Sequence, residues 1–322
     1  MFKKTLFMKI IILIALGCNQ AYATCTPQNG WSDKDQFYDI GTLIIQRDTP
    51  VGATIKTVDI PLVGGGELYA TCSGGESFNS GYAIGWPLLA NNIAQTNIPG
   101  VGVRISNTFG YSGLVVIPWG PQLITTNPIS VYWGNSNFSR IEFIKTATTT
   151  GNGNFTPGRW TYFSIYNQYY VSYLSISSGR ALTVACSITT PSLTFPIGDV
   201  LASSFGNNIG TTPVNAKNTQ SLGLNCDSGA NINVMLQGTQ NPDVSTTSVL
   251  ALTGQGNADV AKGVGVQLLY NDVPLELNNR IVLKQSTGGQ ETFPITARYY
   301  QTKTSVSTGK ANASATLDLT YQ

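Results

Sequence analysis

Short runs in which apolar and polar residues alternate recur along almost the whole chain, and they constrain the fold more than any other feature. Alternation with a period of two places one set of side chains on each face of a β-strand. Clusters of glycine, serine and asparagine separate the runs and supply the positive φ angles that tight turns require. We therefore predict an all-β chain made of β-sandwiches. The runs lie at residues 41–46, 101–105, 114–117, 129–133, 160–165, 171–176, 264–269 and 315–321.

The first residues are typical of an export signal. Three lysines precede the apolar run 10–16, and the small-residue site Ala21-Tyr22-Ala23 follows it. We predict that residues 1–23 are a signal peptide and that the mature, exported chain begins at Thr24. The apolar run is too short for a membrane-spanning helix. An alternative lipoprotein processing site at Cys18 stays open, since Leu16 and Gly17 precede it.

Charge and composition exclude several classes of function. Charged residues make up 11% of the chain, and cleavage removes three lysines and no acid, which turns the net charge of +2 slightly negative. Nucleic-acid binding therefore lacks its basic surface. The sequence contains no histidine, which removes Ser-His-Asp and Cys-His catalysis and the ordinary zinc sites. We expect no catalytic residue, no metal and no cofactor, although a carboxylate pair for glycan hydrolysis stays possible among the 16 acidic residues.

Four cysteines remain after cleavage, and four cysteines allow three disulfide connectivities. We favour Cys25–Cys72 and Cys186–Cys226, because each closes a loop within one half of the chain. Such a loop of about 40 to 50 residues stabilises the fold by about 4 kcal/mol in the chain-entropy model. Disulfides indicate an oxidising compartment such as the periplasm.

A domain boundary is predicted near Ser177-Ser178-Gly179-Arg180. Aromatic residues and turns crowd the sequence before it, and a new module framed by cysteines begins after it. We place two domains, at residues 24–180 and 181–322.

The C-terminal half carries a specific signature. It combines the cysteines at 186 and 226, the run 263–268, Gly309 at the fourteenth position from the end, and a final segment with a penultimate tyrosine. Residues 181–322 resemble the pilin domain of chaperone–usher fimbrial subunits, most closely that of two-domain tip adhesins such as the adhesin of type 1 pili. The resemblance implies an incomplete immunoglobulin-like sandwich, which a strand from another polypeptide completes by β-augmentation.

The final segment supports this interpretation through its own pattern. Ala315, Leu317, Leu319 and Tyr321 fall on one face of a strand, and the residues between them are polar. The family assigns this strand to chaperone binding and implies three partners, a periplasmic pilus chaperone, an outer-membrane usher and the next pilus subunit. An unfilled groove would leave a long hydrophobic edge, so we expect the isolated chain to aggregate. A complete sandwich with this strand at its edge is the alternative.

Residues 24–180 resemble the receptor-binding, lectin-like domains of such tip adhesins, on the segments 39–52 and 99–105 and the early cysteine pair. The resemblance implies a β-sandwich that binds a host glycan or glycoprotein. Sugars need planar rings for stacking and paired polar groups for their hydroxyls. Two loops offer these groups, and they give the candidate ligand-binding residues Ser73, Glu76, Asn79, Tyr166, Asn167, Gln168 and Tyr169.

Each of these residues also has a structural interpretation. Tyr169 and its neighbour Tyr170 would pack the sandwich as strand residues, and Glu76 would be a solvated turn residue. All five tryptophans lie in this half and could anchor a receptor or fill the core. Asp33 and Asp35 could hold a hard cation, but the spacing of a calcium loop is absent, and a solvated turn is the better interpretation.

We therefore predict a fimbrial tip adhesin, because a chain whose folded N-terminal half occupies the place of a donor segment cannot donate a strand and must sit at the end of the pilus. The protein would pass through the periplasm to the cell surface. One alternative is a structural minor pilin or adaptor without receptor binding, and another is a secreted glycan hydrolase.

Overall fold

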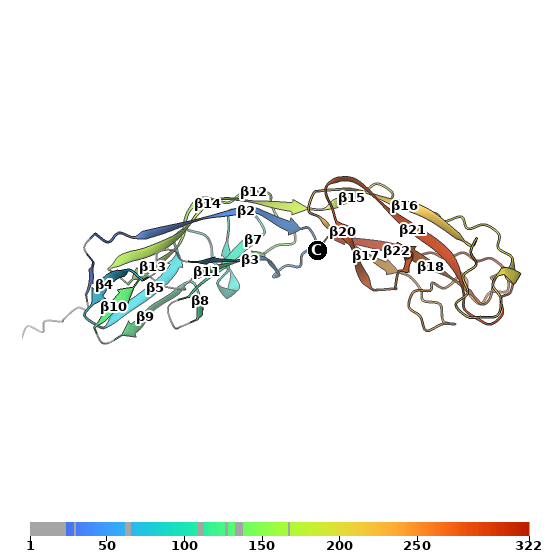
Figure 1. Cartoon of the computed structure of the whole chain (residues 1–322), viewed down its shortest axis with the longest axis horizontal. Coiled ribbons are helices and arrows are strands. Elements are labelled where there is room, and N and C mark those ends of the chain that lie inside the picture. Colours follow the sequence, from blue (N-terminus) through green and yellow to red (C-terminus); the bar gives the residue numbers. More distant parts are fainter. Residues whose placement is uncertain are drawn as a thin grey trace, which may run out of the picture.

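The computed structural model describes residues 24–28, 30–61, 66–108, 113–125, 128–132, 138–166 and 168–321. The predicted signal peptide, residues 1–23, lies outside this part of the chain. The molecule is elongated, with the two halves of the chain placed end to end (Figure 1). The described residues form β-strands and two short 3-10 helices, η1 (Ala90–Asn92) and η2 (Ala202–Ser204), so the predicted all-β class is confirmed. In the described part of the chain, no helix has the length and apolarity needed to cross a membrane.

Three sheets build the N-terminal half, and several of their strands are longer than predicted. The largest sheet has the order β12 (Gly153–Asn154), β14 (Tyr169–Val184), β13 (Gly158–Ile165), β5 (Glu76–Tyr82) and β9 (Trp119–Thr125), with β2 (Lys34–Gln46) beside β14. The facing sheet has the order β3 (Thr54–Pro61), β11 (Phe138–Lys145), β7 (Val101–Thr108) and β6 (Ala94–Gln95), with β8 (Leu114–Val116) beside β7. A small sheet joins β1 (Cys25–Pro27), β4 (Leu68–Cys72) and β10 (Ile129–Tyr132).

Two apolar clusters fill this half. The main cluster lies between the two large sheets and includes Trp160, whose side chain is fully buried and donates its indole N–H to the Thr156 carbonyl at 2.9 Å. Trp86 packs edge-on against Trp160, with 4.7 Å between the ring centroids. A smaller cluster surrounds the first disulfide and includes Tyr69 and Phe78. At least two of the five tryptophans therefore serve packing, while Trp133 lies outside the described residues.

Two sheets build the C-terminal half. The first has the order β15 (Cys186–Ile188), β16 (Lys217–Cys226), β21 (Gly289–Gln301), β18 (Val264–Tyr270) and β19 (Val273–Pro274). The second has the order β20 (Arg280–Gln285), β17 (Asn231–Gln237) and β22 (Thr316–Tyr321). One apolar cluster from both sheets forms the core, with Leu224, Ile232 and Ile295 fully buried.

Both predicted disulfides are confirmed. Cys25 pairs with Cys72 between β1 and β4, and Cys186 pairs with Cys226 between β15 and β16. In each case the two cysteines are also partners in the strand register, so the bridge fixes the first strand of its half against the neighbouring strand.

Strands β2 and β14 run parallel and connect the two halves (Figure 1). Strand β14 passes without interruption through the boundary predicted between residues 180 and 181. Ala181 packs in the main N-terminal cluster, whereas Val184, three residues later, packs in the C-terminal cluster. At the end of β2, Gln46 donates its side-chain amide to the Gly229 carbonyl at 2.8 Å and accepts from the Asn231 amide at 2.9 Å.

Candidate functional site

The start of the mature chain and the residue after the second cysteine are bonded to each other at the free end of the N-terminal half. The Thr24 amide donates to the Ser73 hydroxyl oxygen at 3.0 Å, and the Ser73 amide donates to the Thr24 carbonyl at 3.0 Å. The disulfide beneath them holds both segments together. Ser73 is exposed and therefore accessible from solvent.

Glu76 and Gln168 lie directly beside this disulfide. The Gln168 side chain donates to Glu76 Oε2 at 2.6 Å, and its carbonyl oxygen accepts from the Cys25 amide at 2.8 Å. The Glu76 carboxylate and the two disulfide sulfurs lie within 4.8 Å of one another, but sulfurs joined in a disulfide are not thiolate ligands for a metal. The structure therefore brings together three predicted residues, Ser73, Glu76 and Gln168, from the two predicted loops.

Burial changes what this cluster can do. Glu76 is the first residue of β5 and is only 1% exposed, and its Oε1 has no hydrogen-bond partner among the described residues. The interpretation of Glu76 as a solvated turn residue is thus wrong, because the first disulfide and Gln168 cover it. In this arrangement Glu76 positions Gln168 and, through it, the backbone of Cys25.

Tyr169 is a packing residue in this structure. Its ring meets Tyr69 edge-on, with 6.5 Å between the centroids, and its hydroxyl is buried with no hydrogen-bond partner in the part of the chain that the structure describes. Burial, and then the negative charge of Glu76, raise the pKa of Tyr169 to about 12. Tyr166, in the turn before β14, is 42% exposed, while the predicted residue Asn167 lies outside the described part of the chain.

Asn79 lies apart from the other predicted residues because β5 is a strand and not a loop. Alternation along the strand points Glu76 toward the core and Asn79 toward the outer face of the sheet. There the Asn79 side-chain amide donates to the Tyr162 hydroxyl at 3.3 Å, and Asn79 Oδ1 accepts from the Ser164 hydroxyl at 2.5 Å. The structure thus separates the predicted residues into two places. Ser73, Glu76 and Gln168 form a disulfide-end cluster, whereas Asn79 lies on the outer face of the sheet.

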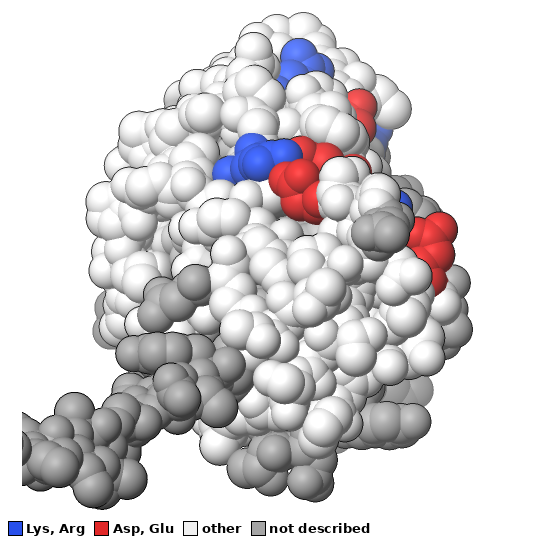
Figure 2. All heavy atoms as spheres, turned by 90° about the vertical axis from the view of Figure 1, so that its left-hand side faces the viewer, with Lys and Arg blue, Asp and Glu red and all other residues white. Residues whose placement is uncertain are grey.

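The described surface at this end of the molecule carries few charges. Figure 2 views the end directly and shows the Lys, Arg, Asp and Glu side chains gathered toward one side of a mainly uncharged face. Asp33 and Asp35, the alternative cation site, both bind Arg159, at 3.0 Å and 2.7 Å. Their carboxylates therefore form an ion-paired cluster with Arg159.

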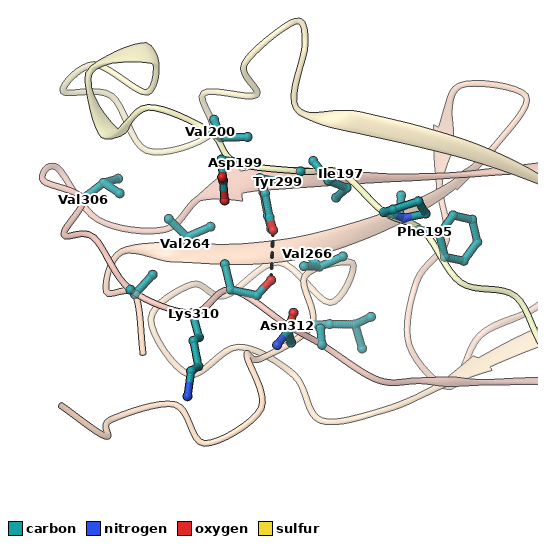
Figure 3. A pocket seen from close by; sticks show the side chains of 18 of the residues that line it. Phe195, Ile197, Asp199, Val200, Val264, Val266, Tyr299, Val306, Lys310 and Asn312 are labelled. Carbon is teal, nitrogen blue, oxygen red and sulfur yellow. Dashed lines mark hydrogen bonds between the residues drawn. The ribbon is translucent and has the colours of Figure 1, made fainter. Parts of the chain in front are cut away.

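The C-terminal half contains an open groove with a volume of about 900 Å³. Its walls are the segments 193–200 and 306–315, and its floor includes Val264 and Val266 of β18. In Figure 3, Ile197, Asp199 and Val200 lie along one wall, and Lys310 and Asn312 lie along the other. Among the described strands, β22 is at the edge of its sheet and pairs only with β17, and the groove wall at residues 306–315 leads into it.

The predicted strand face at the C-terminus is largely reproduced. Leu317 and Leu319 pack on the C-terminal core, and Tyr321 is 1% exposed. Ala315 precedes β22, is exposed and lines the groove. The Tyr299 hydroxyl on the groove floor donates to the Ala311 carbonyl at 3.1 Å and so steadies the wall that leads into β22 (Figure 3).

Two parts of these sites are absent from the sequence predictions. The wall formed by residues 193–200 was not singled out, although Leu193, Phe195 and Ile197 alternate with other residues in the pattern of a strand. Tyr162, which bonds to Asn79, and Tyr173, which stacks with Arg159, are also absent from the predicted set. No local pattern marks them, because strand pairing brings them together.

Comparison with known proteins gives two family matches that divide the chain. A model described as "MrkD-like receptor binding domain" matches residues 38–179, and a model described as "Fimbrial protein" matches residues 175–322. The fimbria adhesin protein of Klebsiella pneumoniae is 29% identical over 329 residues, which cover 99% of each chain. The type 1 fimbrial subunit of Salmonella typhimurium is 32% identical over 153 residues, which cover 45% of this chain and 80% of that one.

Among solved structures, the receptor-binding domain of the plasmid-born adhesin MrkD1P of Klebsiella pneumoniae matches with a TM-score of 0.41 and 22% identity. The match covers 52% of this chain and 99% of that domain.

Proposed function

The chain belongs to the fimbrial protein family, as an adhesin with a receptor-binding half before a pilin half, and we propose that it is the adhesin at the tip of a fimbrium. In this proposal its N-terminal domain, residues 24–180, binds a host glycan or glycoprotein without a cofactor or a catalytic step. Its C-terminal domain, residues 181–322, accepts a β-strand from another polypeptide.

The open groove in the C-terminal half is the observation that carries the proposal. Its floor is apolar, with Val264 and Val266 buried at the base, and its wall at residues 306–315 leads into the edge strand β22. Strand addition requires an unpaired strand edge for main-chain hydrogen bonds and apolar contacts for alternate side chains. The edge strand β22 and the apolar groove floor support this mode of binding. The occupant that fits is an extended segment with an apolar residue at every second position.

The same groove supports the assignment of partners. A periplasmic chaperone would supply the strand before assembly, an outer-membrane usher would receive the complex, and the next pilus subunit would then replace the chaperone. The N-terminal half contains its own sheets and two apolar clusters, and it stands where a donor segment would otherwise begin. A subunit that accepts a strand and donates none fits the end of the fibre.

The receptor-binding role draws its support from the match over residues 38–179 and from the free end of that half. The face seen in Figure 2 is mainly uncharged and lies opposite the end that joins the pilin half. This arrangement suits contact with a host surface. An adaptor subunit that binds no receptor would also have the groove. For such a subunit, deletion of residues 24–180 would leave attachment of the cells to the host unchanged.

The groove can be tested with a synthetic donor peptide. We expect the full-length mature chain to aggregate alone, and to become monomeric with a higher melting temperature when it is refolded with an alternating apolar peptide. A peptide of the same composition without the alternation is the control. Ala313→Phe should block the effect because Ala313 lines the groove, whereas Ala258→Phe, at an exposed position outside the groove, should not. A chain that is monomeric and equally stable without any peptide would contradict the proposal.

The receptor role is tested separately by attachment of fimbriated cells to host glycans and matrix glycoproteins. Attachment should disappear when the N-terminal half is removed. Unchanged attachment would favour the adaptor alternative, and turnover of a labelled oligosaccharide that depends on one carboxylate would favour the glycan hydrolase.

A further inference from the structure

Three tyrosines form a continuous strip on the outer face of the largest N-terminal sheet. Tyr162 on β13 meets Tyr170 on β14 edge-on, with 5.3 Å between the ring centroids, and Tyr170 lies 5.4 Å from Tyr173. Tyr170 is 52% exposed, which leaves a large part of its ring open to solvent. Tyr162 and Tyr173 beside it are half-buried, so the three rings form one partly exposed aromatic surface of the kind that often contacts a partner.

The sheet holds this strip in place. Gly81 lies directly beneath Tyr162, and a Cβ atom at position 81 would stand 2.8 Å from the Tyr162 hydroxyl oxygen and 3.0 to 3.1 Å from two ring carbons. The missing side chain therefore allows the ring to lie against β5. The Asn79 amide donates to the same hydroxyl, and the Ser164 hydroxyl bonds to the other end of the Asn79 side chain. The strip is thus preorganised.

The charged groups beside the strip are already ion-paired, with two carboxylates facing one guanidinium. The Arg159 guanidinium lies over the Tyr173 ring at 3.6 Å, and its Nε and Nη2 groups donate to Asp35 and Asp33. The two carboxylates outnumber the single guanidinium, so the local charge is negative and disfavours sulfate, phosphate or a sugar carboxylate. The strip therefore has little attraction for an anionic ligand.

Polar groups accompany the rings without adding charge. The Asn79 amide has two N–H groups and uses one for Tyr162, and the Tyr162 hydroxyl accepts that bond and keeps its own hydrogen for donation. A pyranose presents an apolar C–H face bordered by hydroxyl groups. The ring of Tyr170 can stack on the C–H face, and the Asn79 amide and the Tyr162 phenol can hydrogen-bond to the hydroxyl groups.

We propose that the strip of Tyr162, Tyr170 and Tyr173, with Asn79, is a platform that binds a neutral saccharide. The inference rests on the proposed adhesin function and adds to it a surface and a ligand class. It also moves the binding surface from the disulfide-end cluster, where Glu76 is buried, to the exposed face of the sheet.

The test uses fimbriated cells that display the full-length chain, with fimbriae quantified by antibody, on an array of neutral, sialylated and sulfated oligosaccharides. We expect binding to neutral saccharides, a loss of at least tenfold for Tyr170→Ala, and retained binding for Tyr170→Phe. Gly81→Ala should also weaken binding, since it displaces the Tyr162 ring. Tyr132→Ala, at an exposed tyrosine on β10 and outside the strip, is the matched control and should stay within twofold.

Each other outcome overturns the inference. Wild-type binding that survives both Tyr170→Ala and Gly81→Ala would place the receptor site elsewhere, with the adhesin function intact. A preference for sialylated or sulfated ligands, or attachment that requires only a protein receptor, would refute the ligand class. Normal fimbriation without attachment of the wild type to any host glycan or glycoprotein would remove the receptor role itself.

Discussion

Asp48 and Tyr321, 273 residues apart in the sequence, bond to each other through both backbone and side chain at the junction of the two halves. The Tyr321 amide donates to Asp48 Oδ2 at 3.0 Å, and the Asp48 amide donates to the Tyr321 carbonyl at 3.0 Å. Arg47 covers the Tyr321 ring, with 4.6 Å between its guanidinium carbon and the ring centroid, and also pairs with Asp48. The end of the edge strand β22 is therefore bonded to the turn that follows β2 in the receptor-binding half.

Loss of the Asp48 carboxylate should loosen this junction. We expect Asp48→Ala to lower the free energy of unfolding by about 1 to 2 kcal/mol, because hydrogen bonds to a charged group are stronger than neutral ones. Urea denaturation of the chain stabilised by a donor peptide measures the effect. Asp259→Ala removes a carboxylate that pairs with Lys310 on an exposed surface, and it should cost about 0.5 kcal/mol or less. Equal effects of the two substitutions would show that the Asp48–Tyr321 junction does not contribute to the free energy of unfolding.

The same carboxylate predicts a dependence of stability on pH. Burial raises the pKa of Asp48, but the bonds from Arg47 and Tyr321 and the charge of Lys145 outweigh burial and lower the pKa below its ordinary value of 3.8. The stabilisation is therefore complete above 3.8 and is lost as the pH falls through the lower pKa of the folded state. The melting temperature of the wild type should fall more steeply in this acid range than that of Asp48→Asn. Parallel curves would contradict the assignment.

Glu76 should act as a structural acceptor at the disulfide end. Glu76→Ala leaves the Gln168 amide without its acceptor at 2.6 Å, so we expect a loss of about 1 to 3 kcal/mol in the free energy of unfolding. Glu76→Gln keeps a carbonyl oxygen in place and buries no charge, and it should be tolerated without loss. Chemical denaturation compares the two variants. An equal loss in both would mean that the negative charge itself is required.

Tyr299 should contribute to the shape of the groove. Tyr299→Phe removes the hydroxyl that bonds to the Ala311 carbonyl at 3.1 Å. Because a neutral hydrogen bond is worth about 1 kcal/mol, we expect about a fivefold weaker affinity for a donor peptide. Titration calorimetry or fluorescence anisotropy gives the affinity. Tyr300→Phe is the matched control. The Tyr300 side chain points to the face of β21 opposite to Tyr299, so this substitution should leave the affinity unchanged.

The sequence was sufficient for the fold class, for both disulfides and for the strand near the C-terminus. Alternation with a period of two is a local property, and it identified Trp160–Ile165 within β13 and Val264–Leu269 within β18. The cysteine pairs were found because the spacing within each half favours one connectivity. The division into domains stays a proposal, since β14 crosses the predicted boundary as one continuous strand.

The tertiary structure decided where the predicted binding residues point and what surrounds them. Ser73, Glu76 and Gln168 from the two predicted loops lie together at the first disulfide, but Glu76 is buried there, and Asn79 lies on the opposite face of the same sheet. The tyrosine strip and the Asp48–Tyr321 junction depend on strand pairing and on packing across a long sequence separation. Alternation along one strand gives the two faces of that strand alone, so only the register between strands could reveal which side chains become neighbours.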